Sequence, residues 1–353
     1  MNYDPDLEPV LKELRDTDAT LAQRLDAIAA RLDKLEQAPA PQPEPTPAPT
    51  MNRQLIGLAI PDGEMMTNTA AKLQRIRDLG VTAVRMDVRY ERPLSYYDGI
   101  IGTLRDAGID VLAILGGNAK AATQAEAETF ARHISDAVKW LAERGVNNVQ
   151  FWNEPNHASR ITTPENYTRA IRLAYPAAKA ANPQVFCVGA GLSAINDSVN
   201  GHISTTDWLN RCYAAGAKGH YDALAVHPYS YPFDLDNGSD WTGWGNMVKR
   251  MRPVMEANGE GHLKIWATEA GFPTSGGASG NTEANQKAMY ADKLLAEVRK
   301  LPWLGPLFHY GLDDRGGSTT DSENWFGLYR PDGTAKPAAA SLRAAIATLN
   351  NGA

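Results

Sequence analysis

The sequence predicts an α/β protein: a (β/α)8, or TIM, barrel that follows an N-terminal coiled-coil helix and a proline-rich linker. Eight short apolar segments alternate with longer amphipathic or alanine-rich segments from Gln54 onward. Most of the apolar segments are continuous, which is typical of parallel strands covered on both faces, and roughly 300 residues suit eight βα units. The expected strands are residues 55–60, 83–88, 111–115, 149–152, 185–190, 223–226, 264–268 and 307–310.

A doubly wound open sheet is the alternative architecture. Such a sheet is expected to carry a glycine-rich phosphate-binding turn after its first strand. Residues 57–63 read Gly-Leu-Ala-Ile-Pro-Asp-Gly, which lacks the G-x-G-x-x-G spacing. The closed barrel is therefore favoured.

The N-terminal segment is predicted to form a coiled coil over residues 7–35. Asp18 fills one step of the heptad pattern, where a polar layer fixes register at some cost in stability. One amphipathic helix packed on its own domain is the alternative, but the narrow apolar seam favours a homo-oligomer. Leucine at both a and d leaves dimer, trimer and tetramer open. The apolar seam consists of Leu7, Leu11, Leu14, Leu21, Leu25, Ile28, Leu32 and Leu35.

A proline-rich linker follows the predicted coiled coil. Residues 38–50 carry six prolines at alternate positions, a pattern that is incompatible with helix and sheet ladders. At ~3.1 Å per residue an extended segment of this length spans roughly 40 Å. The sequence thus predicts three parts: an oligomerisation helix (1–37), a linker (38–50) and a barrel domain (51–353).

Composition excludes several classes of protein. The chain has 353 residues, of which 43% are hydrophobic, so it can bury a large core. Residues 1–50 hold ten acidic and five basic side chains and thus −5 of the formal −6, which leaves −1 for the rest. No basic face is available for nucleic acid, and no apolar run reaches the ~18 to 20 residues that cross a bilayer.

The N-terminal residues and the two cysteines add two expectations. The chain starts Met-Asn-Tyr-Asp-Pro-Asp, without the basic and apolar regions of a signal peptide. Cys187 and Cys212 are too few for a disulfide framework and lack metal-site spacing. Both are expected to be buried free thiols.

Polar and aromatic residues close several of the expected strands. In a (β/α)8 barrel, loops at the carboxyl ends of the strands build the active site, so these residues are expected to meet at one rim. They are Arg85 and Asp87 on the second strand, Trp152 to Asn156 on the fourth, His227 to Tyr229 on the sixth, Glu269 to Gly271 on the seventh, and His309 and Tyr310 on the eighth, followed by Asp313 and Asp314.

Two carboxylates, Glu154 and Glu269, are expected at this rim. Paired carboxylates serve glycosidic cleavage, because one donates a proton to the departing oxygen while the other attacks or stabilises the anomeric carbon. Alternatively, each glutamate caps a helix or joins a surface ion pair. Their common position after apolar strands, among Asn, Arg, His, Tyr and Trp, favours the catalytic interpretation.

Two motifs carry a family resemblance. Trp-Asn-Glu-Pro-Asn at 152–156 and Thr-Glu-Ala-Gly at 268–271 resemble the motifs of glycoside hydrolase clan A, the retaining (β/α)8 glycosidases, in which an Asn-Glu pair ends the fourth strand and a second Glu ends the seventh. The sequence is most similar to the β-xylosidase-like branch of that clan, family 39 and its relatives. The resemblance covers roughly residues 54–349.

The resemblance implies roles for individual residues. Glu154 would be the general acid/base, Glu269 the nucleophile, and Asn153 a partner of the sugar 2-hydroxyl. Arg85 and Tyr229 would flank the nucleophile. The alternative for Arg85 is a buried structural ion pair. For Tyr229, and for His227 two residues before it, the alternative is a polar strand end without ligand contact.

The aromatic platform for the sugar is expected at one of several positions. Clan members often place a tryptophan at the end of the eighth strand, where this chain has Phe-His-Tyr at 308–310. Ordinary packing is the alternative for each candidate, and a solvated loop is the alternative for a subsite at residues 313–315. The candidates for substrate binding are Trp241, Trp244, Trp325 and Tyr310.

The sequence therefore predicts a retaining O-glycoside hydrolase that needs neither a metal nor an organic cofactor. The seven histidines show no H-x-x-x-H spacing. A non-catalytic carbohydrate-binding or adhesion protein on a decayed barrel is the alternative. Coiled coil, stalk and lack of a signal peptide favour a phage tail protein acting on host envelope glycan, with a cytoplasmic enzyme or another export route as alternatives.

Overall fold

The computed structural model describes residues 51–353 apart from 160–161, 237, 276–279 and 352–353, together with residues 21 and 23. Apart from residues 21 and 23, the predicted coiled coil and linker lie outside the described residues, and both stay predictions. The chain divides into two units, Met1–Pro47 and Ala48–Ala353.

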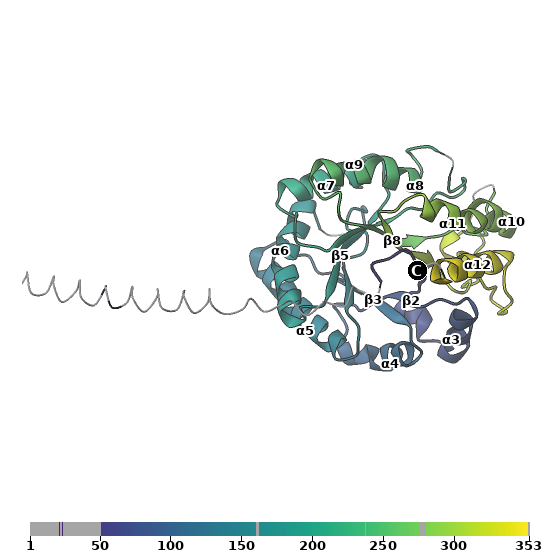
Figure 1. Ribbon diagram of the computed structural model, residues 1–353, viewed down its shortest axis with the longest axis horizontal. Coiled ribbons are helices and arrows are strands. Elements are labelled where there is room, and N and C mark those ends of the chain that lie inside the picture. Colours follow the sequence, from purple (N-terminus) through teal and green to yellow (C-terminus); the bar gives the residue numbers. More distant parts are fainter. Residues whose placement is uncertain are drawn as a thin grey trace, which may run out of the picture. The chain divides into compact units, whose positions relative to one another are not determined.

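Eight parallel strands form a closed barrel, in which β1 to β8 follow one another in chain order and β1 pairs with β8. This confirms the predicted (β/α)8 barrel, with strand bounds that shift by a few residues. Figure 1 shows the helices as a ring around the strands. The strands are β1 (Ile56–Ala59), β2 (Ala83–Asp87), β3 (Asp110–Leu115), β4 (Asn148–Phe151), β5 (Phe186–Ser193), β6 (Ala223–His227), β7 (Ile265–Ala270) and β8 (Leu304–Tyr310).

Helices connect successive strands, and several begin at sequence-encoded caps. Thr123 starts α5 with a capping box that includes Glu126, and Thr163 caps α6 just before Pro164. The helices are α2 (Asp62–Met65), α3 (Thr69–Asp78), α4 (Asp98–Asp106), α5 (Gln124–Ala142), α6 (Pro164–Ala181), α7 (Thr205–Ala214), α8 (Gly243–Asn246), α9 (Arg252–Ala257), α10 (Glu283–Asn285), α11 (Asp292–Arg299) and α12 (Pro337–Asn351). Two short 3₁₀ helices are η2 (Leu94–Tyr97) and η5 (Ser322–Asn324). Two short π-helices are η3 (Met247–Met251) and η4 (Gln286–Ala291).

The barrel interior changes from apolar to polar along its axis. One buried cluster fills the interior with Ala83, Ala225, Trp266 and Phe308, among others, while a larger cluster packs the helices on the outside of the strands. Side chains of a strand alternate between its two faces. Arg85 lies two positions after Ala83 on β2. Its side chain therefore points into the same interior, at the carboxyl end of the barrel.

Register shifts in two strand pairs modify this alternation. The register between β5 and β6 shifts between Val188 and Gly191, and that between β7 and β8 shifts twice, between Ile265 and Ala267 and between Ala267 and Ala270. A bulge of this kind re-aims the neighbouring side chain. Glu269 lies within the shifted part of β7, so the bulge helps determine where its carboxylate points.

Two smaller expectations can be compared with the structure. Cys187 and Cys212 are free and buried, as predicted, and burial raises the pKa of the Cys212 thiol to about 12. Within the described part of the chain, every helix falls short of the length and apolarity needed to cross a membrane.

Candidate active site

Arg85 connects the polar residues at the carboxyl end of the barrel. Its side chain is buried and donates to three oxygen acceptors, with His227 Nε2 a further 3.4 Å contact. Nη1 donates to Glu269 Oε1 at 2.6 Å, Nη2 to Asn153 Oδ1 at 2.7 Å, and Nε to Gln150 Oε1 at 2.9 Å. Because the guanidinium is planar and offers its donors in a fixed fork, these contacts hold Glu269 and Asn153 in one arrangement.

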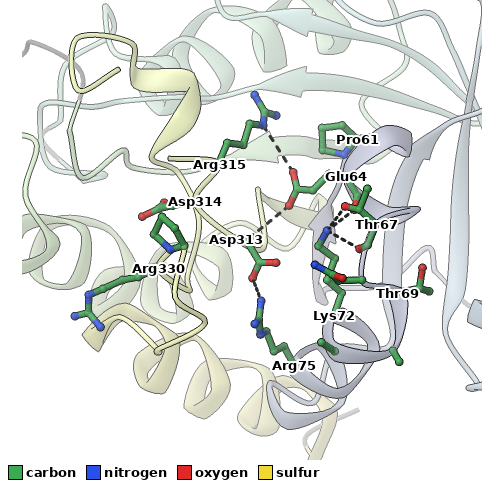
Figure 2. A pocket seen from close by; sticks show the side chains of 14 residues that line it. Pro61, Glu64, Thr67, Thr69, Lys72, Arg75, Asp313, Asp314, Arg315 and Arg330 are labelled. Carbon is green, nitrogen blue, oxygen red and sulfur yellow. Dashed lines mark hydrogen bonds and ion pairs between the residues drawn. The ribbon is translucent and has the colours of Figure 1, made fainter. Parts of the chain in front are cut away.

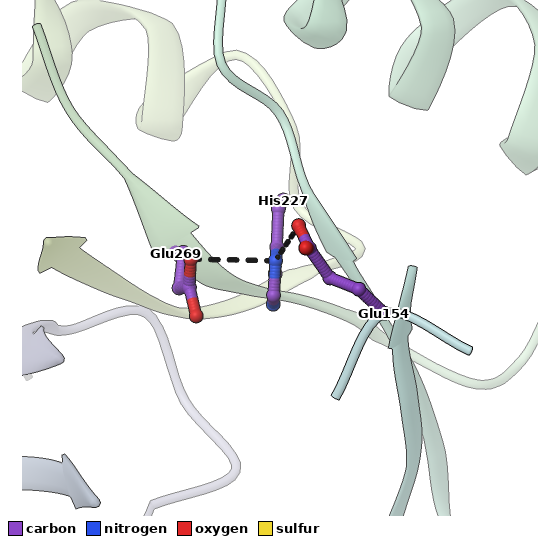
Figure 3. A group of neighbouring side chains, drawn as sticks. All are labelled: Glu154, His227 and Glu269. Carbon is purple, nitrogen blue, oxygen red and sulfur yellow. Dashed lines mark hydrogen bonds and ion pairs between the residues drawn. The ribbon is translucent and has the colours of Figure 1, made fainter. Parts of the chain in front are cut away.

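The two candidate catalytic glutamates lie on either side of His227, as Figure 3 shows. His227 Nδ1 is 2.8 Å from Glu154 Oε1 and 3.4 Å from Glu269 Oε2. One oxygen of each carboxylate and the imidazole nitrogen all lie within 4.8 Å of one another. The barrel thus brings together two carboxylates that are 115 residues apart in the sequence.

Tyr229 is the second donor to the β7 glutamate. Its hydroxyl donates to Glu269 Oε2 at 2.8 Å, so each carboxylate oxygen of Glu269 has a donor. Burial, followed by the nearby charge of Glu269, raises the pKa of the Tyr229 hydroxyl well above its ordinary value. The phenol therefore stays protonated and remains a hydrogen-bond donor.

The backbone around Glu154 adopts an unusual conformation. Trp152 and Glu154 have φ angles of 64° and 45°, a left-handed region that non-glycine residues rarely occupy. The Glu154 amide donates to the Gly191 carbonyl at 2.8 Å, which ties the turn to the β5 bulge. Strained backbone of this kind clusters at functional sites.

Gly191 makes room for the site. A Cβ atom at this position would lie 2.5 Å from His227 Nε2 and 2.8 Å from Gln150 Nε2. Both contacts are shorter than van der Waals packing permits. Glycine here lets the β5 backbone approach the ring of His227, which contacts both glutamates, more closely than any residue with a Cβ atom could.

Gln150 and Gly191 are site residues that sequence reasoning missed. Gln150 is fully buried, and its side-chain amide donates to the Trp152 carbonyl at 2.8 Å while its oxygen accepts from Arg85. The available signal was a polar residue at an inward-facing position of an otherwise apolar strand. The role of Gly191 depends on the β5 bulge, for which the sequence carries no comparable signal.

A pocket of about 200 Å³ opens beside these residues. Arg85, Asn153, Glu269 and Tyr310 from the predicted set line it, together with Asp87. Burial raises the pKa of the Asp87 carboxyl, against the opposing effect of the Arg85 charge. The pocket is large enough for a small polar group such as one sugar ring and reaches the β7 carboxylate.

Tyr310 differs from the three tryptophan candidates because it lines the pocket. Its hydroxyl donates to Glu323 Oε2 at 3.1 Å and accepts from Arg315 Nη2 at 3.0 Å. Its ring meets that of Tyr229 edge-on at 6.3 Å. Tyr310 thus forms the aromatic wall next to Glu269.

The tryptophans are placed differently from one another. Trp241 is 48% exposed and meets the Phe233 ring edge-on at 4.6 Å, so it can contact a ligand. Trp244 is only 4% exposed and belongs to the apolar core; this burial does not fit the expectation of a sugar platform. Trp325 is partly buried, and its indole nitrogen donates to the Ser318 carbonyl at 2.9 Å.

Other polar residues after β8 have structural partners. His309 faces away from the pocket, with its ring nitrogens 3.2 Å from the Tyr290 hydroxyl and from the Phe326 carbonyl. Asp314 forms a buried ion pair with Lys336 at 2.7 Å, and Asp313 pairs with Arg75. Among the predicted strand-end residues, His309 and Asp314 have structural partners and do not line the pocket beside Glu269.

The grouping of Glu154, His227 and Glu269 has the composition of a metal site, because each offers a ligand atom. However, Arg85 donates to Glu269, and its Nη2 lies 3.4 Å from His227 Nε2. A cation bound there would be repelled by this guanidinium. Catalysis without a metal stays a prediction.

A closed parallel barrel with two carboxylates at the carboxyl ends of its strands defines a site of the TIM-barrel glycosidase class. Residues 108–336 match the family model described as the glycosyl hydrolase catalytic core. This match covers more than half of the chain, so the chain belongs to that family of glycoside hydrolases. No curated protein matches the chain.

Solved structures with the same fold include several glycosidases. A family 39 glycoside hydrolase from Bacteroides cellulosilyticus WH2 is 22% identical, with a TM-score of 0.66 over 84% of this chain. A glucosidase from Croceicoccus marinus is 15% identical, with a TM-score of 0.65 over 85% of this chain and 68% of its own. Xylanase 10B from Thermotoga maritima is 14% identical, with a TM-score of 0.58 over 84% of this chain and 96% of its own. The present chain spans 64% of the family 39 structure, and at these identities the likeness concerns the fold.

Proposed function

We propose that the protein is a retaining O-glycoside hydrolase that cleaves an oligo- or polysaccharide, with Glu269 as nucleophile and Glu154 as general acid/base. The observation that carries the proposal is the closeness of the two carboxylates, which offer oxygens within 4.8 Å of each other. Retaining enzymes hold their carboxyl groups ~5 to 5.5 Å apart, whereas inverting enzymes leave ~6.5 to 9.5 Å for a water molecule.

In the first step, Glu269 attacks the anomeric carbon while Glu154 gives its proton to the glycosidic oxygen. The C–O bond to the leaving group breaks, and an ester bond between the sugar and Glu269 forms. The leaving group departs as a neutral alcohol, and Glu154 is left as a carboxylate.

In the second step, Glu154 takes a proton from a water molecule, whose oxygen attacks the anomeric carbon from the face that the leaving group vacated. The ester bond to Glu269 breaks, which restores both carboxyl groups to their starting states. The two inversions together retain the anomeric configuration.

The surrounding contacts support this assignment of roles. Arg85 and Tyr229 each donate to Glu269, which keeps its charge compensated and its orientation fixed. Asn153, held by Arg85, is available for the sugar 2-hydroxyl beside the nucleophile. His227 lies closest to Glu154 and is proposed to position the acid/base.

Azide rescue tests the two roles separately. Glu154→Ala should lose most of its turnover on an activated aryl glycoside, and azide should restore it with an azide product of retained configuration. Glu269→Ala should not give that retained product. Glu165→Gln, an exposed glutamate paired with Arg211, is the control. Full activity in both alanine variants would refute the assignment, and glycan binding without turnover in the unaltered protein would favour the non-catalytic alternative.

We further propose that residues 7–35 join several copies of the barrel. We also propose that the protein is a phage tail protein that acts on host envelope glycan. The support is the heptad pattern followed by the alternate prolines of residues 38–50. Mass spectrometry of purified virions tests the location. Exclusive recovery of the protein from host cytoplasm would contradict it.

A further inference from the structure

A second, larger cavity lies next to the candidate active site. It has a volume of about 870 Å³ and opens between the α2–α3 segment and the chain that follows β8 (Figure 2). Pro61 lines both this cavity and the pocket beside Glu269. The two spaces are therefore neighbours at the same rim of the barrel.

Acidic and basic side chains alternate in the lining of this cavity. Glu64 from α2 points across it toward the opposite wall, where Arg315 Nε is 3.8 Å from Glu64 Oε2. Arg75 from α3 pairs with Asp313 after β8. Both pairs connect the two walls, so carboxylate and guanidinium groups face the same space.

Glu64 lacks a full set of partners for its carboxyl group. Its side chain is nine-tenths buried, yet Oε2 has no hydrogen-bond partner among the described residues. Burial raises the pKa of this carboxyl, against the opposing effect of the Arg315 charge. A buried carboxyl oxygen without a hydrogen bond is costly, so a donor supplied by a ligand would stabilise it.

The lining favours a neutral polyhydroxyl ligand. An anion would meet Glu64 and Asp313, and a cation would meet Arg75 and Arg315. Lys72 and Arg330 also line the cavity, but Lys72 donates to the Glu64 and Thr67 carbonyls and Arg330 pairs with Glu283. A hydroxyl group both donates and accepts, so it can bond to either member of each pair. Thr67, Asn68 and Thr69 also line the cavity. The two threonine hydroxyls donate to the Glu64 and Met65 carbonyls, so toward a ligand hydroxyl they act as acceptors.

The position of the catalytic residues indicates which part of a glycan reaches this cavity. Glu269, Asn153 and Arg85 line the smaller pocket, whereas Glu154 does not. A nucleophile and a 2-hydroxyl partner contact the sugar whose anomeric carbon reacts, while the acid contacts the leaving-group oxygen. The smaller pocket is thus the glycone side, and the larger cavity continues it away from the leaving group.

We propose that this cavity binds the next neutral sugar residues on the non-reducing side of the cleaved bond. The inference rests on the proposed glycosidase function and deepens it. Binding energy from remote sugars lowers the barrier at the reacting centre when it is realised in the transition state. The enzyme would therefore prefer a glycone of at least two sugars over a single terminal sugar.

The test blocks the cavity without altering the catalytic residues. Ala70, an exposed residue near the start of α3, lines the cavity, so Ala70→Trp should fill part of it. Ala125, the second residue of α5, is also exposed and provides the matched control Ala125→Trp. Ala71→Trp, at another exposed lining position, replaces Ala70→Trp if that variant melts at a lower temperature.

Two measurements are compared. The first is kcat/KM for 4-nitrophenyl β-xyloside and β-glucoside against the corresponding xylobioside and cellobioside. We expect at least a roughly tenfold preference for one of the disaccharides, which Ala70→Trp abolishes and Ala125→Trp keeps. The second is ligand-observed NMR of xylotriose and cellotriose, whose contact with the protein should weaken only in Ala70→Trp.

Each outcome decides a specific point. Equal efficiency on one- and two-sugar glycones, or a preference that survives Ala70→Trp, overturns the cavity proposal. Failure to hydrolyse any of the four glycosides counts against the proposed function, and the NMR measurement then decides the cavity proposal by itself. Oligosaccharide contact that is absent, or unchanged by Ala70→Trp, overturns it.

Discussion

Arg85 determines the local geometry of the candidate site through its three donors. A lysine would keep the positive charge, but its single ammonium group cannot reproduce the planar fork that reaches Glu269, Asn153 and Gln150. The arginine therefore orients the site as well as neutralising it. Its burial makes the ion pair with Glu269 less screened by solvent than a surface pair would be.

Tyr229→Phe should lower kcat about 10- to 100-fold while leaving the melting temperature nearly unchanged. The change removes the hydroxyl that donates to Glu269, and a hydrogen bond to a charged group contributes about 1.5 to 3 kcal/mol. Steady-state kinetics on an aryl glycoside measure the effect.

The matched control for this variant is Tyr213→Phe. Tyr213 also donates to a glutamate, Glu260, at 2.8 Å, but it lies on α7, outside the candidate site. Its kcat should stay that of the unaltered protein. Equal kcat values for both variants and the unaltered protein would show that the Tyr229 hydroxyl does not assist the reaction.

At the scale of elements, irregularities in two strands help to determine where the side chains of the candidate site point. The β7 bulge re-aims Glu269, and the β5 bulge brings Gly191 under His227. The turn after β4 uses left-handed φ angles at Trp152 and Glu154. Regular alternation alone would not bring both glutamates to one imidazole, so local strain is part of how the barrel builds the site.

β8 carries a histidine that should make stability depend on pH. Burial of His309 lowers its pKa from 6.5 to about 3, so the folded state keeps the imidazole neutral where the unfolded chain protonates it. The unfolded state thus binds more protons between pH 6.5 and about 3. The stabilising contribution is complete above pH 6.5 and is lost as the pH falls, by about 1.4 kcal/mol per unit.

Urea unfolding at pH 7 and pH 5 checks this dependence. His309 should lower the free energy of unfolding by about 2 kcal/mol between pH 7 and pH 5, so His309→Gln should change the measured pH difference by that amount. His262→Gln, at an exposed position, should leave it unchanged. The same pH difference in both variants would mean that His309 does not control it.

The loop after β6 holds two tryptophans whose burial predicts opposite results. Trp241→Ala should weaken action on a long glycan more than on a short aryl glycoside, because its exposed ring offers a surface for the apolar face of a sugar. Trp244→Ala should instead destabilise the fold by about 3 to 5 kcal/mol, as truncation of a buried aromatic does. Thermal unfolding and kinetics on both substrates separate the two effects, and identical behaviour of the two variants would contradict the assignment.

At the scale of the whole molecule, the barrel domain is expected to work without the N-terminal segment. A chain that begins at Met51 should be monomeric by light scattering and keep its kcat/KM on a small substrate, because the barrel has its own closed core. The full-length chain should be oligomeric. If the shortened chain stays oligomeric, the barrel itself supplies the interface. That result would contradict the prediction that residues 7–35 set the oligomeric state.

The sequence by itself determined the order of strands and helices, and it indicated which residues lie at the strand ends. Apolar runs of strand length and polar residues directly after them are local patterns, so Glu154, Glu269, Arg85 and Tyr229 could be selected without coordinates. The motifs around the two glutamates indicated glycosidase chemistry. These predictions rest on short-range periodicity, which a single sequence displays directly.

Only the tertiary structure decided which of these side chains meet. It separated His309, buried against Tyr290, from His227, which contacts both glutamates, and exposed Trp241 from buried Trp244. It also revealed the cavity beside Pro61. Such outcomes depend on bulges, backbone strain and packing between segments more than a hundred residues apart, and the free energy of those contacts exists only when the barrel closes.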